Sequence, residues 1–75
     1  MEQLSYEILD LVKRKMREQG AYDEDAYKEY IQETIEYFRE KGKLTDEDND
    51  ELIEDELVNA WENVKDDLAV EEEEI

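Results

Sequence analysis

The sequence predicts an all-α fold, a small three-helix bundle that runs up, down and up again and ends in an acidic C-terminal tail. Three observations lead to this prediction. Apolar residues recur at steps of three and four along most of the chain, which is the period of one face of an α-helix. Gly20 and Gly42 divide the chain into three such stretches, and there is no proline. With 75 residues, the chain has room for one domain.

The first predicted helix covers about residues 2–19. Gly20 follows it, at the position where a left-handed residue commonly ends a helix. A basic patch near its C-terminal end complements the helix dipole, and we expect this patch to pair with carboxylates of the other helices. The apolar face consists of Leu4, Ile8, Leu11, Val12 and Met16, and the basic patch of Lys13, Arg14, Lys15 and Arg17.

The second predicted helix covers about residues 24–41. Asp23 has the side chain of an N-cap, and Gly42 marks the end. Connections of about three residues make consecutive helices antiparallel neighbours. The apolar stripe consists of Tyr27, Ile31, Thr34, Ile35 and Phe38. A row of glutamates on the other side is interpreted as a solvated face, and it consists of Glu29, Glu33, Glu36 and Glu40.

The third predicted helix covers about residues 46–69 and is the longest. Thr45 and Asp48 resemble a capping box at its start. Its length predicts that it extends past one end of the bundle. Residues 1–69 then form one helical domain, and residues 70–75 form an acidic tail that is a candidate for disorder. The apolar face consists of Ile53, Leu57, Ala60, Trp61, Val64 and Leu68, with Trp61 as a core anchor.

The charge of the chain is strongly uneven. The net charge is −17, and residues 44–75 account for −14 of it, with fifteen acidic residues and one basic residue. Such a surface repels nucleic acid and acidic membranes and attracts basic protein surfaces. No apolar run has the length of a membrane span, and the first residues lack the pattern of a secretory signal. We therefore expect a cytoplasmic protein that contacts neither nucleic acid nor membrane directly.

The residue types exclude most catalytic and metal chemistry. The chain has no cysteine and no histidine, so the usual thiolate and imidazole ligands and the commonest general base are missing. A calcium loop starting at Asp46 would need glycine where Glu51 stands and glutamate where Leu57 stands. No glycine-rich phosphate loop and no catalytic triad pattern is present. We expect no enzymatic activity, no cofactor and no specific metal site.

Carboxylates along the third predicted helix are the best candidate binding residues. At 100° per residue they form one strip, which a groove lined with lysine and arginine could accept in place of a nucleic acid backbone. In composition the chain resembles small acidic inhibitors encoded by phages and mobile elements. The predicted contact residues are Asp48, Glu51, Asp55, Glu62 and Asp66, with Tyr30 and Tyr37 as weaker candidates.

Two other interpretations remain open from the sequence. Tyr30 and Tyr37 lie beside the apolar stripe of the second helix, so an apolar flank could bind a partner protein or a second copy of the chain. In that case the chain is a helical adaptor or structural module, and its charge keeps it dispersed. Alternatively, the acidity is an adaptation to a salt-rich environment. Binding that survives high salt would favour the adaptor over the nucleic-acid mimic.

Overall fold

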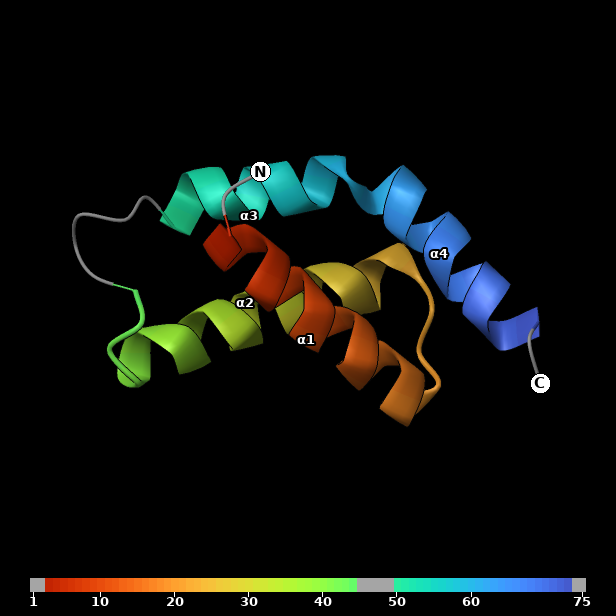
Figure 1. The fold of residues 1–75 in the computed structure, drawn as a ribbon, viewed down its shortest axis with the longest axis horizontal. Helices are drawn as coiled ribbons and strands as arrows, with labels where there is room; N and C mark the ends of the chain where they lie inside the picture. Colours follow the sequence, from red (N-terminus) through yellow and green to blue (C-terminus); the bar gives the residue numbers. More distant parts are fainter. Residues whose placement is uncertain (1–2, 45–49, 74–75) are drawn as a thin grey trace.

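Helices α1 and α2 form an antiparallel pair, and α3 and α4 follow each other across one side of this pair (Figure 1). The computed structural model describes residues 3–44 and 50–73, with side chains as far as Leu68. Its helices are α1 (Gln3–Gln19), α2 (Glu24–Glu40), α3 (Asp50–Asn59) and α4 (Trp61–Glu73). The molecule is elongated, with extents of 40 × 21 × 20 Å.

Asp23 starts α2, as the sequence predicts. Its backbone is extended, and its side chain accepts a hydrogen bond from the Ala26 amide at 2.8 Å. The bond satisfies one of the amides that have no partner within the first turn of a helix. Glu24 and Asp25 lie in that first turn, where negative charge stabilises the positive end of the helix dipole.

Glycine ends both α1 and α2, which confirms the prediction for Gly20 and Gly42. Their φ angles are +66° and +76°, in the left-handed region. After α1, the Ala21 amide donates to the Met16 carbonyl at 3.0 Å; after α2, the Lys43 amide donates to the Phe38 carbonyl at 2.9 Å. This is the Schellman pattern, in which the left-handed residue lets the chain satisfy the last carbonyls of the helix.

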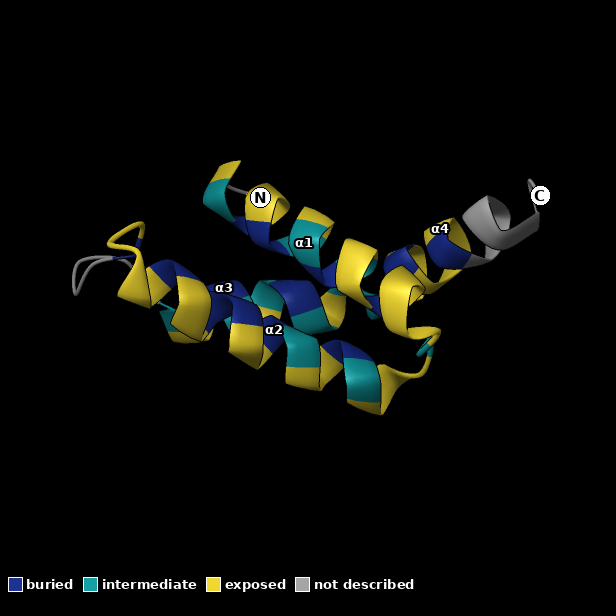
Figure 2. Cartoon of the chain, turned by 90° about the horizontal axis from the view of Figure 1, so that it is seen from below, coloured by how far each residue is buried: buried dark blue, intermediate teal, exposed yellow. Residues whose placement is uncertain are grey.

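The core lies between the four helices, where their buried faces meet (Figure 2). The predicted stripe of α2 is entirely buried, and Leu44 joins the core from the segment after it. Trp61 is half-buried and packs against this core rather than at its centre. The buried apolar residues are Ile8, Val12, Met16, Tyr27, Ile31, Ile35, Phe38, Leu44, Ile53, Leu57, Val64 and Leu68.

The prediction of three helices is wrong, because the third predicted helix is two. In place of one helix over residues 46–69, α3 ends at Asn59 and α4 begins at Trp61. In an unbroken helix the Leu57 carbonyl would accept the Trp61 amide. Here it accepts the Ala60 amide at 3.1 Å and the hydroxyl of Tyr27. A side chain that enters the hydrogen-bond ladder in this way is a recognised cause of a helix break.

Two predictions at the ends of the third helix have different outcomes. The capping box of Thr45 and Asp48 lies outside the described residues. At the other end, α4 continues to Glu73, beyond the expected end at residue 69. It extends past the ends of α1 and α2 at the right of Figure 1, as the length argument predicts. That residues 70–75 are a disordered tail stays a prediction.

Candidate functional site

Most of the predicted acidic contact residues are exposed on α3 and α4. Glu51 and Asp55 lie on α3, and Glu62 and Asp66 lie on α4. Asp48 lies outside the described residues. Within each helix the two carboxylates are four residues apart, so they stand about one turn from each other. The break at Ala60 divides the predicted strip, and the acidic surface consists of two segments on two helices.

Basic residues of α1 pair with carboxylates of the other helices, as the sequence predicts for the basic patch. Lys13 Nζ lies 3.4 Å from Asp67 Oδ2 on α4, and Lys15 Nζ lies 3.4 Å from Glu33 Oε1 on α2. Arg14 instead pairs within α1, with Asp10 at 3.5 Å. These pairs place compensating charge on the sides of α2 and α4 that adjoin α1.

The outer carboxylates of α3 and α4 receive little compensation. Glu62 has Lys65 at 3.6 Å, and both side chains are more than half exposed, so water screens that pair. Within the described part of the chain, Glu51, Asp55 and Asp66 make no ion pair. A surface helix with uncompensated charge produces a negative potential that reaches into solvent and fades over a Debye length.

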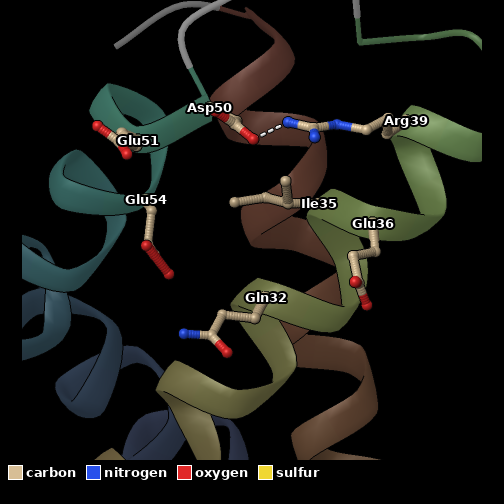
Figure 3. Close-up of a pocket in the computed structure, with 7 residues that line it drawn as sticks. All are labelled: Gln32, Ile35, Glu36, Arg39, Asp50, Glu51 and Glu54. Carbon is tan, nitrogen blue, oxygen red and sulfur yellow. Dashed lines mark hydrogen bonds and ion pairs between the residues drawn. The ribbon is translucent and has the colours of Figure 1, made fainter.

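An acidic groove between α2 and α3 extends this surface (Figure 3). Its volume is about 360 Å³. Ile35 extends into the space between the helices, and the ion pair of Arg39 with Asp50 bridges the two helices beside it. Carboxylates from both helices line the rest, so the groove suits a cationic side chain with an apolar stem. The lining residues are Gln32, Ile35, Glu36, Arg39, Asp50, Glu51 and Glu54.

The groove brings together residues that the sequence does not connect. Glu36 belongs to the row that was interpreted as a solvated face, and Glu51 belongs to the predicted contact strip. Glu54 was not a candidate at all. Helical periodicity places residues on the faces of their own helix, but it does not specify which face of α2 adjoins which face of α3. The sequence offers no local signal for this pairing.

The tyrosines of α2 lie in different surroundings. Tyr30 is half-buried, and the Lys15 ammonium lies 5.7 Å from its ring centre. Tyr37 is 50% exposed and lines a second groove, of about 450 Å³, between α1 and α2. Leu11 and Thr34 line the same groove, together with charged residues of both signs. Tyr37 is therefore accessible to a partner, whereas Tyr30 is largely occupied by contacts within the chain.

Burial raises the pKa of Tyr27 from 10.0 to about 12. Its hydroxyl donates to the Leu57 carbonyl, and the phenol stays neutral at physiological pH. It is therefore a structural hydrogen-bond donor and not a general base. No group of three or more acidic side chains suited to a metal ion occurs among the described residues. None of the described helices combines the length and the apolarity that crossing a membrane requires.

The charged surface is thus the feature with the clearest chemistry. It offers carboxylates held on helices, a groove lined by further carboxylates, and a separate mixed-charge groove around Tyr37. Such surfaces select partners by charge and shape rather than by covalent chemistry. Comparison with family models, curated proteins and solved structures finds no match to this chain.

Proposed function

We propose that this protein is a non-enzymatic nucleic-acid mimic that binds and blocks a basic groove of a nucleic-acid-handling protein. Its contact surface consists of the exposed carboxylates of α3 and α4, together with Asp48 in the segment before α3. The partner supplies lysine and arginine side chains that otherwise neutralise phosphates. A cytoplasmic inhibitor of the phage or mobile-element type fits this description.

The observation that carries the proposal is that Glu51, Asp55 and Asp66 are exposed on helices and make no ion pair with any residue that the structure describes. A net charge of magnitude about 2–8 is sufficient to keep a small domain dispersed, and this chain has −17. Because the carboxylates are already held on helices, a partner binds them without a large ordering cost. The groove between α2 and α3 adds a place for one inserted lysine or arginine.

Charge reversal with a matched control tests this proposal. The test variant carries Asp55→Lys and Glu62→Lys, one on each acidic helix. The control variant carries Glu29→Lys and Glu40→Lys, which change the net charge equally on exposed positions of α2. Each tagged chain is immobilised and challenged with purified DNA- and RNA-binding proteins from one host, with and without competing duplex DNA.

If the protein is a nucleic-acid mimic, we expect the three chains to differ in binding as follows. The parent and the α2 control retain a nucleic-acid-binding protein, duplex DNA displaces it, and roughly 0.5 M salt releases it. The α3–α4 variant loses this binding while its circular dichroism spectrum stays helical. Equal loss in both variants would mean that net charge alone attracts the partner. Binding that DNA does not displace would exclude mimicry.

A second candidate function rests on the groove between α1 and α2. Tyr37 is half exposed there beside Leu11, and the charges around the two residues are of both signs. Tyrosine is enriched at protein interfaces because it combines an apolar ring with a polar tip. As a helical adaptor or a homodimer, the protein would use this groove, and binding would persist at high salt. Replacement of Tyr37 by alanine would then abolish binding, and charge reversal on α3 and α4 would not.

A further inference from the structure

The break between α3 and α4 lacks glycine and proline, the usual local causes of a helix break. Residues 57–61 contain neither glycine nor proline, and Ala60 has the highest helix propensity of all residue types. The apolar residues keep their helical period from Ile53 through Leu68. A chain with this sequence favours one continuous helix, so the cause of the break must come from elsewhere in the fold.

Tyr27 of α2 contacts both sides of the break. Its hydroxyl donates to the carbonyl of Leu57, which lies in the last turn of α3. The centre of its ring lies 4.9 Å from the ring centre of Trp61, which is the first residue of α4. The side chain is fully buried, so this position is fixed by the core. With the Leu57 carbonyl bound to Tyr27 and Ala60, the helical pattern resumes only at Ala60, whose carbonyl accepts the Val64 amide at 3.0 Å.

We infer that Tyr27 holds residues 50–73 in a bent state, and that the same segment has a second, straight state in which it is a single helix. Two arrangements of one segment, separated by the gain or loss of a few contacts, form a two-state element. In the straight state the Trp61 amide takes the place of the Ala60 amide at the Leu57 carbonyl, and this carbonyl turns from the Tyr27 hydroxyl toward the helix axis. The hydroxyl of Tyr27 is therefore a positioning group for α4.

The bend determines how the two acidic segments are oriented. Glu51 and Asp55 precede the break, and Glu62 and Asp66 follow it. A ligand that prefers one orientation shifts the population toward that state by its difference in affinity. This consequence for binding rests on the proposed function, whereas the two-state element itself does not.

Amide hydrogen exchange measured by NMR on the full chain tests the inference without any partner. In the parent, the Trp61 amide lacks its helical acceptor, so it exchanges faster than the Val64 amide. Tyr27→Phe keeps the ring and removes the hydroxyl, so we expect Trp61 exchange to slow roughly tenfold or more. The Cα chemical shift of Ala60, the one residue between the two helices, moves toward helical values at the same time. Tyr37→Phe, which removes an exposed hydroxyl, is the matched control and leaves both signals unchanged.

A second variant separates the contribution of Tyr27 from a local cause. Asn59→Ala improves helix propensity at an exposed position and keeps Tyr27. If Tyr27 holds the break, Asn59→Ala leaves the Trp61 amide unprotected. If Asn59→Ala alone slows exchange of the Trp61 amide, the inference is wrong. Unchanged exchange in a folded Tyr27→Phe chain would also overturn it, because packing of Val64 and Leu68 would then be what bends the segment.

Discussion

Lys13 of α1 and Asp67 of α4 are joined across the bundle, with 3.4 Å between Nζ and Oδ2. The Lys13 side chain is only 19% exposed, so its stem packs among neighbouring helices while its ammonium reaches the carboxylate. Asp67 follows the break at Ala60 in the chain, so the pair ties α4 to α1. Together with Lys15 and Arg39, which also pair with carboxylates of another helix, Lys13 offsets part of the repulsion between the acidic helices.

Lys13→Gln is expected to lower the free energy of unfolding by about 1 kcal/mol. The change removes part of the buried methylene chain of Lys13 and the ion pair with Asp67. Arg14→Gln is the control. It removes the same charge from an ion pair with Asp10 in which both side chains are more than 60% exposed. That change should cost less than about 0.5 kcal/mol. Urea unfolding followed by circular dichroism measures both. Equal costs would indicate that only net charge matters.

Ile31→Ala is expected to cost about 2–5 kcal/mol, because the side chain is fully buried in the core and its removal leaves a cavity. Total stability of a domain of this size is on the order of 5 kcal/mol, so this change removes a large share of it. Tyr6→Ala, at a position that is 57% exposed, serves as the control and should retain a cooperative transition. An Ile31→Ala chain that unfolds with the same free energy as the parent would contradict the assigned core.

The sequence predicts those elements whose signals are local. The stripe of α2 is buried as its period requires, and Asp23, Gly20 and Gly42 act at the helix ends because capping depends on residues only a few positions away. The break at Ala60 was missed because its cause, Tyr27, lies about thirty residues earlier in the chain. The groove joining Glu36 to Glu54 was missed for the same reason, since it depends on how two helices meet.

Gly42→Ala is expected to cost about 1 kcal/mol. An added Cβ would meet no atom within 4 Å, so the cost comes from the left-handed backbone alone. Gly42→Asn should cost less, because asparagine tolerates this region better than alanine does. Thermal unfolding of the two variants under identical conditions tests the order. A larger loss for asparagine would point to a steric cause instead.

Added salt is expected to raise the melting temperature. Repulsion within a chain of net charge −17 destabilises the compact state, and raising the salt from about 0.01 M to about 1 M shortens the Debye length from roughly 30 Å to roughly 3 Å. The Glu29→Lys, Glu40→Lys chain carries less repulsion and should gain less from the same salt. Scanning calorimetry across sodium chloride concentrations measures both curves. A parent chain that salt does not stabilise would show that its ion pairs outweigh its repulsion.

The stability of the parent chain is expected to fall between pH 10 and pH 12 because of Tyr27. Burial raises the pKa of this phenol in the folded chain from 10.0 to about 12, so the folded state holds the proton more tightly than the unfolded state. The stabilisation is fully present below pH 10 and is lost as the pH rises through 12. A shift of this size corresponds to a loss on the order of 3 kcal/mol. Tyr27→Phe has no such proton and is otherwise the same chain. The difference in unfolding free energy between the two chains, from urea curves taken across this range, isolates the contribution of Tyr27. A constant difference would mean that the phenol is not buried in solution.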